Sequence, residues 1–173
     1  MRWYRRLVEA MLLLLAVVLQ VGLLSRLGLP GATPDLVLVF VVALALQRGP
    51  LIGCVYGFGA GLMLDLTPPS TGVLGVTALL LLLIGYAAGR AKSDEHAILR
   101  PLAVVSVSAV FLVIGYALIA GLVDRRSLDW HSVPLVLVTE VLYCLILATF
   151  VIPGLAWVER RMVVLQEGPF RGL

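Results

Sequence analysis

Long apolar segments recur along this sequence. The segment Leu102–Val123 carries no charged residue, and a membrane-spanning helix needs about 20 mainly apolar residues. The whole chain is 61% hydrophobic and 13% charged, whereas a soluble domain is about 45–50% apolar and about 25% charged. A 173-residue soluble fold has too little interior to hide this apolar surface, and disorder requires the opposite composition. The sequence therefore predicts an all-α integral membrane protein.

Six membrane-spanning helices are predicted, forming one transmembrane domain over residues 1–173. Leu36–Leu64 is the difficult segment, because one helix of 29 residues would measure about 43 Å against a hydrocarbon core of about 30 Å. Gly49-Pro50 is a strong turn signal inside it, and proline suits the first position of a new helix. The predicted spans are Leu7–Leu24, Asp35–Gln47, Pro50–Asp65, Gly72–Ala88, Leu102–Val123 and Val133–Ile152.

The distribution of basic residues favours six spans over five. With six spans and a cytoplasmic N-terminus, 10 of the 13 basic residues lie on the cytoplasmic side. With five spans only 5 lie inside, 7 lie outside, and Arg48 is buried in lipid. Because cytoplasmic loops carry an excess of lysine and arginine, we expect an inner-membrane, multi-pass protein with both termini in the cytoplasm.

Residues 155–173 are predicted to form a cytoplasmic interfacial tail. After Pro153, the residues Leu155, Val158, Met162 and Leu165 share one helical face, as in helices that lie along a membrane surface. A frayed end of the last span, anchored by basic residues, explains the pattern equally well. Both interpretations place this segment outside the hydrocarbon core.

The sequence contains no recognisable catalytic or metal-binding pattern. Cys54 and Cys144 lie within predicted spans and have no cysteine or histidine partner at metal spacing. No phosphate-binding glycine loop, nucleophile elbow or zinc-protease motif is present. We therefore expect no enzyme activity, no cofactor and no metal, and the net charge of +3 does not indicate nucleic-acid binding.

Glycines recur at every fourth position along the third predicted span. In lipid, helices associate mainly through close backbone packing, which small residues allow. The stripe could pack within this bundle, which we favour because six helices already supply neighbours, or it could dock a partner's transmembrane helix. The residues are Gly49, Gly53, Gly57 and Gly61, and Gly85 and Gly89 repeat the spacing near the end of the fourth span.

Four polar residues of the predicted spans fall in the outer half of the membrane. They are Gln20, Asp35, Asp65 and Glu140. Glu140 lies about 10 Å below the outer end of its span, and a central carboxylate costs about 2.5–3.5 kcal/mol on insertion scales. It should therefore face protein, a cavity or a cation. The alternatives are a hydrogen bond that locks the bundle, a proton or solute site, and a partner contact.

A pattern of glycine, acidic and apolar residues runs through the middle of the chain, roughly over Pro34–Gly89. It comprises Pro34-Asp35-Leu36, Gly53, Gly57-Phe58, Gly61-Leu62, Asp65 and Gly75. With this pattern the chain resembles the MreD family of bacterial rod shape-determining membrane proteins. The resemblance implies a non-enzymatic scaffold that binds MreC and helps position lateral peptidoglycan synthesis. MreB, RodA and a class B penicillin-binding protein are further implied partners. By motif match, Asp35 and the set Gly53, Gly57, Phe58, Gly61, Asp65 and Gly75 would shape the bundle and a partner-facing surface.

A second interpretation is a transporter component. MreD proteins are similar in architecture to the six-helix substrate-binding components of energy-coupling vitamin transporters. Such a component would use the outer-half polar residues as a solute pocket. It would also commonly show Ala-x-x-x-Ala in its first helix, where this chain has only Ala10 and Ala16. The scaffold is therefore the preferred interpretation.

Overall fold

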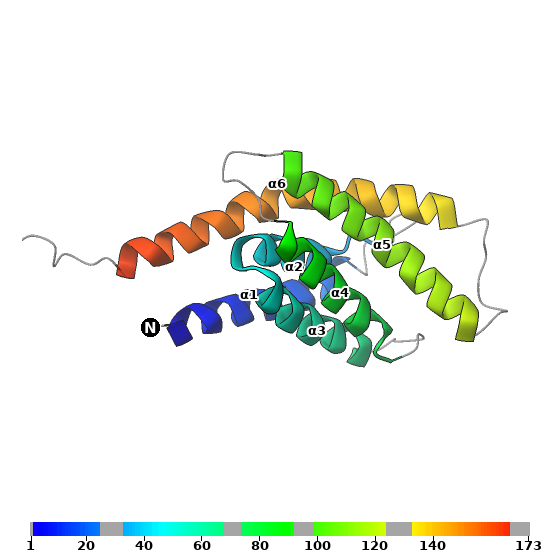
Figure 1. Cartoon of the computed structure of the whole chain (residues 1–173), viewed down its shortest axis with the longest axis horizontal. Helices are drawn as coiled ribbons and strands as arrows, with labels where there is room; N and C mark the ends of the chain where they lie inside the picture. The colour runs from blue at the N-terminus through cyan, green and yellow to red at the C-terminus, as the bar shows by residue number, and fades with distance from the viewer. Residues whose placement is uncertain (1, 25–32, 68–73, 92–98, 124–132, 167–173) are drawn as a thin grey trace, which may run out of the picture.

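The described part of the chain is entirely helical. The computed structural model describes residues 2–24, 33–67, 74–91, 99–123 and 133–166. These residues form six helices and no strand (Figure 1). The helices are α1 (Arg2–Gly22), α2 (Leu36–Arg48), α3 (Pro50–Leu66), α4 (Val76–Arg90), α5 (Leu99–Val123) and α6 (Val133–Gln166). The all-helical prediction is confirmed, and so is the break between α2 and α3.

The turn between α2 and α3 forms where the sequence predicts it. Gly49 separates the two helices with a φ of 91°, a backbone conformation that favours glycine because other residues meet a steric penalty from Cβ. Pro50 then occupies the first turn of α3, where its missing N–H costs no helical hydrogen bond. One long apolar segment thus becomes two short helices.

The short helix α2 lies at the centre of the bundle. Nine consecutive side chains, Val37 to Ala45, are buried, and α2 contacts each of the other five helices. The sequence explains this position, because α2 is apolar on every side up to Gln47 and has no polar face to present to a headgroup or to water. Its 13 residues measure only about 20 Å along the axis.

Two long apolar helices, α5 and α6, expose much of their surface. Within the described residues, two helical stretches are long and apolar enough to cross a membrane, Leu99–Ile119 of α5 and Val133–Val158 of α6. Both are buried over only a small part of their surface, and α5 and α6 pack together (Figure 1). Large apolar side chains such as Phe111 and Ile146 are therefore exposed, as expected for a lipid-facing surface.

Helix α6 does not end at Ile152, where the last predicted span stops. It continues through Pro153 to Gln166, and Leu155 still packs into the core. Neighbouring helices can re-satisfy the backbone group that a proline frees, so a membrane helix tolerates this residue. The interfacial position of residues 155–173 stays a prediction, and residues 167–173 lie outside the described part.

Candidate functional site

The glycine stripe of α3 packs directly against α4. A Cβ atom added at Gly53, Gly57 or Gly61 would lie closer than 3.0 Å to atoms of α4, namely the Gly85 carbonyl, the Leu81 carbonyl and the Ala78 backbone. Such distances leave no room for any side chain. In the structure, α4 therefore packs along the stripe, within the bundle.

The same close approach continues to the end of the hairpin. A Cβ added at Gly89 would overlap the backbone of Gly49 and Pro50, so the end of α4 lies against the α2–α3 turn. Gly59 differs, because a Cβ there would meet nothing within 4 Å. Phe58 is also exposed, at 47%. Phe58 therefore lies on the exposed surface of α3, unlike Gly53, Gly57 and Gly61, which lie against α4.

Asp65 joins the end of α3 to the start of α4. Its Oδ2 atom accepts hydrogen bonds from the backbone N–H groups of Gly75, at 2.9 Å, and Ala78, at 3.1 Å. Gly75 caps α4 in the left-handed conformation with a φ of 92°, which glycine adopts without a penalty. The first N–H groups of a helix lack partners within the helix, so the buried Asp65 carboxylate closes this hairpin as a cap from the preceding helix.

Replacing Asp65 by alanine should therefore destabilise the protein by about 1–2 kcal/mol, the usual effect of losing a helix cap. The free energy of unfolding, measured by titration with sodium dodecyl sulfate and circular dichroism, would report the loss. Thr67→Ala is the matched control, because the Thr67 hydroxyl donates a hydrogen bond only to the Met63 carbonyl, one helical turn earlier in α3, and does not join α3 to α4. Equal stability of Asp65→Ala and Thr67→Ala would contradict the capping role.

Three of the four predicted outer-half polar residues meet at the start of α2. Asp35 Oδ1 accepts the N–H of Leu38, and Gln20 Oε1, from α1, accepts the N–H of Val37, each at 2.8 Å. Glu140, from α6, interacts electrostatically with Asp35 and is only 5% exposed. Side chains from three parts of the chain thus surround the buried start of α2. Asp65 is not among them, because its carboxylate lies at the start of α4.

Cys144 completes this group. Its thiol donates to Glu140 Oε1 at 3.2 Å, and its sulfur lies 4.0 Å from the Asp35 carbonyl oxygen. Glu140 is therefore held one helical turn from Cys144, between α6 and the start of α2. Backbone N–H groups that are buried away from water need acceptors, and the first turn of α2, with Val37 and Leu38, is buried in the bundle. The arrangement favours a capping and packing function for Gln20, Asp35 and Glu140.

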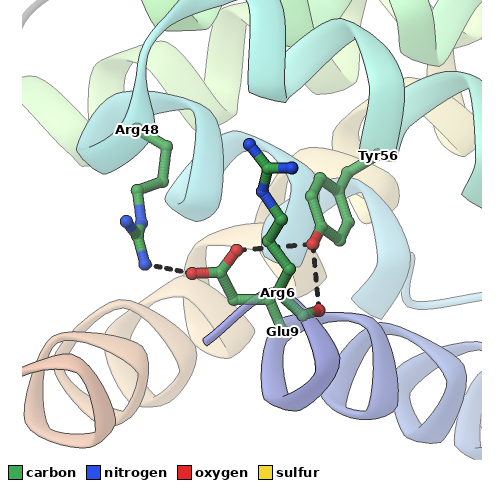
Figure 2. Close-up of polar contacts among 4 residues, drawn as sticks. All are labelled: Arg6, Glu9, Arg48 and Tyr56. Carbon is green, nitrogen blue, oxygen red and sulfur yellow. Dashed lines mark hydrogen bonds and ion pairs between the residues drawn. The ribbon is translucent and has the colours of Figure 1, made fainter. Parts of the chain in front are cut away.

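A second polar cluster, at the opposite end of α2, was not predicted from the sequence (Figure 2). Glu9 of α1 is only 2% exposed, and its Oε1 atom forms an ion pair with Arg48. Tyr56 of α3 donates its hydroxyl towards Glu9 Oε2, at 3.4 Å, and the Arg6 carbonyl, at 3.2 Å. One buried carboxylate thus ties α1 to both sides of the α2–α3 turn.

A signal for this cluster is present in the sequence. Glu9 is a carboxylate inside an apolar segment, and a buried charge needs a partner of opposite sign. Arg48 is an equally isolated cation within the next apolar segment, on the same predicted side of the membrane. Pairing the two would have placed α1 beside the α2–α3 turn.

The family comparison agrees with the resemblance seen in the sequence. The family model for the rod shape-determining protein MreD matches residues 1–158. The chain belongs to the MreD family. This match extends well beyond the stretch Pro34–Gly89 on which the resemblance rested and includes part of every helix. No curated protein and no solved structure matches the chain.

Membership assigns this chain to a family of membrane proteins that determine rod shape. The expected likeness to the substrate-binding components of vitamin transporters has no matching structure and stays a prediction. Among the residues that the structure describes, no group of three or more histidine, cysteine or acidic side chains could hold a metal ion. The geometry assigns the buried polar side chains to helix caps and an ion pair.

Proposed function

We propose that the chain is a non-enzymatic membrane scaffold of the bacterial cell-elongation complex and that it binds MreC. The MreD family match carries this proposal, because it assigns the chain to rod shape determination. The geometry supports a scaffold in a second way. Asp35, Asp65 and Gln20 accept backbone hydrogen bonds within the bundle, so these groups are engaged in holding helices rather than in lining a solute site.

The proposed topology has six membrane crossings and both termini in the cytoplasm. Helices α2, α3 and α4 are short and apolar, and they would cross beside the longer α5 and α6. Arg48 lies at the α2–α3 turn, which supports a cytoplasmic position for that turn because arginine is enriched in cytoplasmic loops. The protein would then lie in the bacterial inner membrane.

The partner-facing surface is proposed to include Phe58. This side chain is the one member of the predicted packing set that projects outward as a large aromatic group, from a helix whose other face is closed by α4. Between membrane helices, association depends on van der Waals packing rather than on a hydrophobic driving force. An exposed aromatic side chain beside the open Gly59 offers a shaped surface for such a contact.

Phe58→Ala should therefore reduce capture of coexpressed MreC by about tenfold or more, as expected for loss of an aromatic hot spot. The matched control is Phe111→Ala on α5, because Phe111 is exposed to the same degree, 46% against 47%. Capture would be measured by affinity purification of the tagged chain from membranes, followed by quantitative immunoblotting.

The same experiment tests the wider proposal. Recovery of MreC with the unchanged chain, and its loss in Phe58→Ala but not in Phe111→Ala, would support the scaffold and its surface. Failure of the unchanged chain to capture MreC would contradict the scaffold. Copurification with a bound vitamin or with ATPase subunits would instead identify a transporter component.

A further inference from the structure

Arginine side chains gather where α1 begins. Arg5 and Arg6 lie in the first turns of α1, and Arg48 reaches the same region from the end of α2. Arg6 and Arg48 both interact electrostatically with Tyr56, so each guanidinium group lies within electrostatic reach of this side chain. Figure 2 shows the Arg6 guanidinium extending past Glu9, between Arg48 and Tyr56. Glu9 is the one carboxylate among these residues, so the cluster is positively charged overall.

Arg5 supplies the observation that points to a ligand. Its Nε atom is buried and has no hydrogen-bond acceptor among the described residues. A buried donor without an acceptor is costly, by about 1–3 kcal/mol, so such groups in folded proteins usually have a partner, and one without a protein partner points to a bound water, ion or ligand. Arg5 lies one turn before Glu9 on the same face of α1, and Glu9 in turn pairs with Arg48 of the cluster.

The aromatic side chains of α1 indicate the depth of this cluster in the membrane. Trp3 and Tyr4 precede Arg5 directly, and they are 79% and 64% exposed. Tryptophan and tyrosine are enriched at the level of the lipid headgroups, because their rings are apolar and their N–H or O–H groups seek water. Arg5 and Arg6 therefore lie at the depth where phospholipid phosphates lie.

We propose that Arg5 and Arg6 bind the phosphate group of an anionic phospholipid beside the start of α1. A guanidinium donates two parallel hydrogen bonds to phosphate oxygens, and the buried Nε of Arg5 would provide one of them. The net positive charge of the cluster favours an anionic lipid over a zwitterionic one. Glu9 holds Arg48 against α1 and thereby keeps this third positive charge beside the site. The lipid would fill the corner between α1 and the α2–α3 turn.

Native mass spectrometry of the purified full-length chain would measure this binding. We expect phosphatidylglycerol to bind the unchanged protein, phosphatidylcholine to bind much more weakly, and inorganic phosphate not to compete at millimolar concentration. Arg5→Gln should weaken phosphatidylglycerol binding by about tenfold, the ratio expected for loss of one hydrogen bond to a charged group. The melting temperature in dodecyl maltoside micelles would establish that the variant is folded.

Arg90→Gln is the matched control, because it removes the same charge from a guanidinium that already contacts Tyr86 through a hydrogen bond and a cation–π interaction. It should bind phosphatidylglycerol like the unchanged protein. Arg5→Lys keeps the charge but lacks the Nε donor and should also bind more weakly. Equal binding of Arg5→Gln and Arg90→Gln, equal binding of the two lipids, or displacement of the lipid by inorganic phosphate would each overturn the proposal. None of these results depends on whether the chain captures MreC.

Discussion

Replacing Gly57 by alanine should destabilise the bundle by about 1–3 kcal/mol, as expected for overpacking of a closely packed interface. The added methyl group would overlap the Leu81 carbonyl, which belongs to the backbone of α4 and cannot rotate away. The two helices would have to separate along the most extensive helix contact in the bundle. Because α4 also packs on the central α2, the displacement would spread into the core.

Gly59→Ala is the matched control, two residues further along the same helix. A methyl group there meets nothing within 4 Å, and alanine is the better helix former by about 0.8–1.0 kcal/mol. This variant should be as stable as the unchanged chain or slightly more stable. Both variants would be compared by sodium dodecyl sulfate titration. Equal stability of the two variants would contradict the close α3–α4 packing.

The contrast between these glycines shows how far the sequence could predict the site. Spacing of four predicts that a helix approaches the stripe, since small residues on one face allow close backbone contact. It does not say which helix approaches. The structure supplies α4, which packs along α3, and Asp65 accepts hydrogen bonds from N–H groups at the start of α4. The packing of α3 on α4 depends on contacts between residues that are distant in the sequence, which a local residue pattern does not specify.

The helices themselves were predictable because their signals are local. Apolar length, the Gly49-Pro50 turn and the acidic residue before α2 are each signals that act within a few residues. The observed bounds of α2 and α3 therefore differ from the predicted bounds by no more than one residue at each end. The last predicted span stops at Ile152, whereas α6 runs on through Pro153 without a break, since a proline normally ends a helix in water but can be tolerated in a membrane bundle. The Glu9–Arg48 pair was missed because its members are 39 residues apart.

Replacing Glu9 by leucine should destabilise the protein by about 3 kcal/mol, the lower end of the range for removing one partner from a buried ion pair. The lower end applies because the Arg48 side chain remains 20% exposed and water screens part of its charge. Tyr56→Phe is the control within the same cluster. It removes only long hydroxyl hydrogen bonds, of 3.2 and 3.4 Å, and should cost less than about 1 kcal/mol.

The double variant Glu9→Leu/Arg48→Leu separates the ion pair from the packing around it. Breaking one partner leaves a charge in a poorly solvated position, whereas replacing both partners by apolar residues removes that charge, and such replacements are often neutral or stabilising. We therefore expect the double variant to recover most of the stability that Glu9→Leu loses, in the same sodium dodecyl sulfate titration. If the double variant is as unstable as Glu9→Leu alone, the loss does not arise from the uncompensated Arg48 charge, and the ion pair is not what joins α1 to the α2–α3 turn.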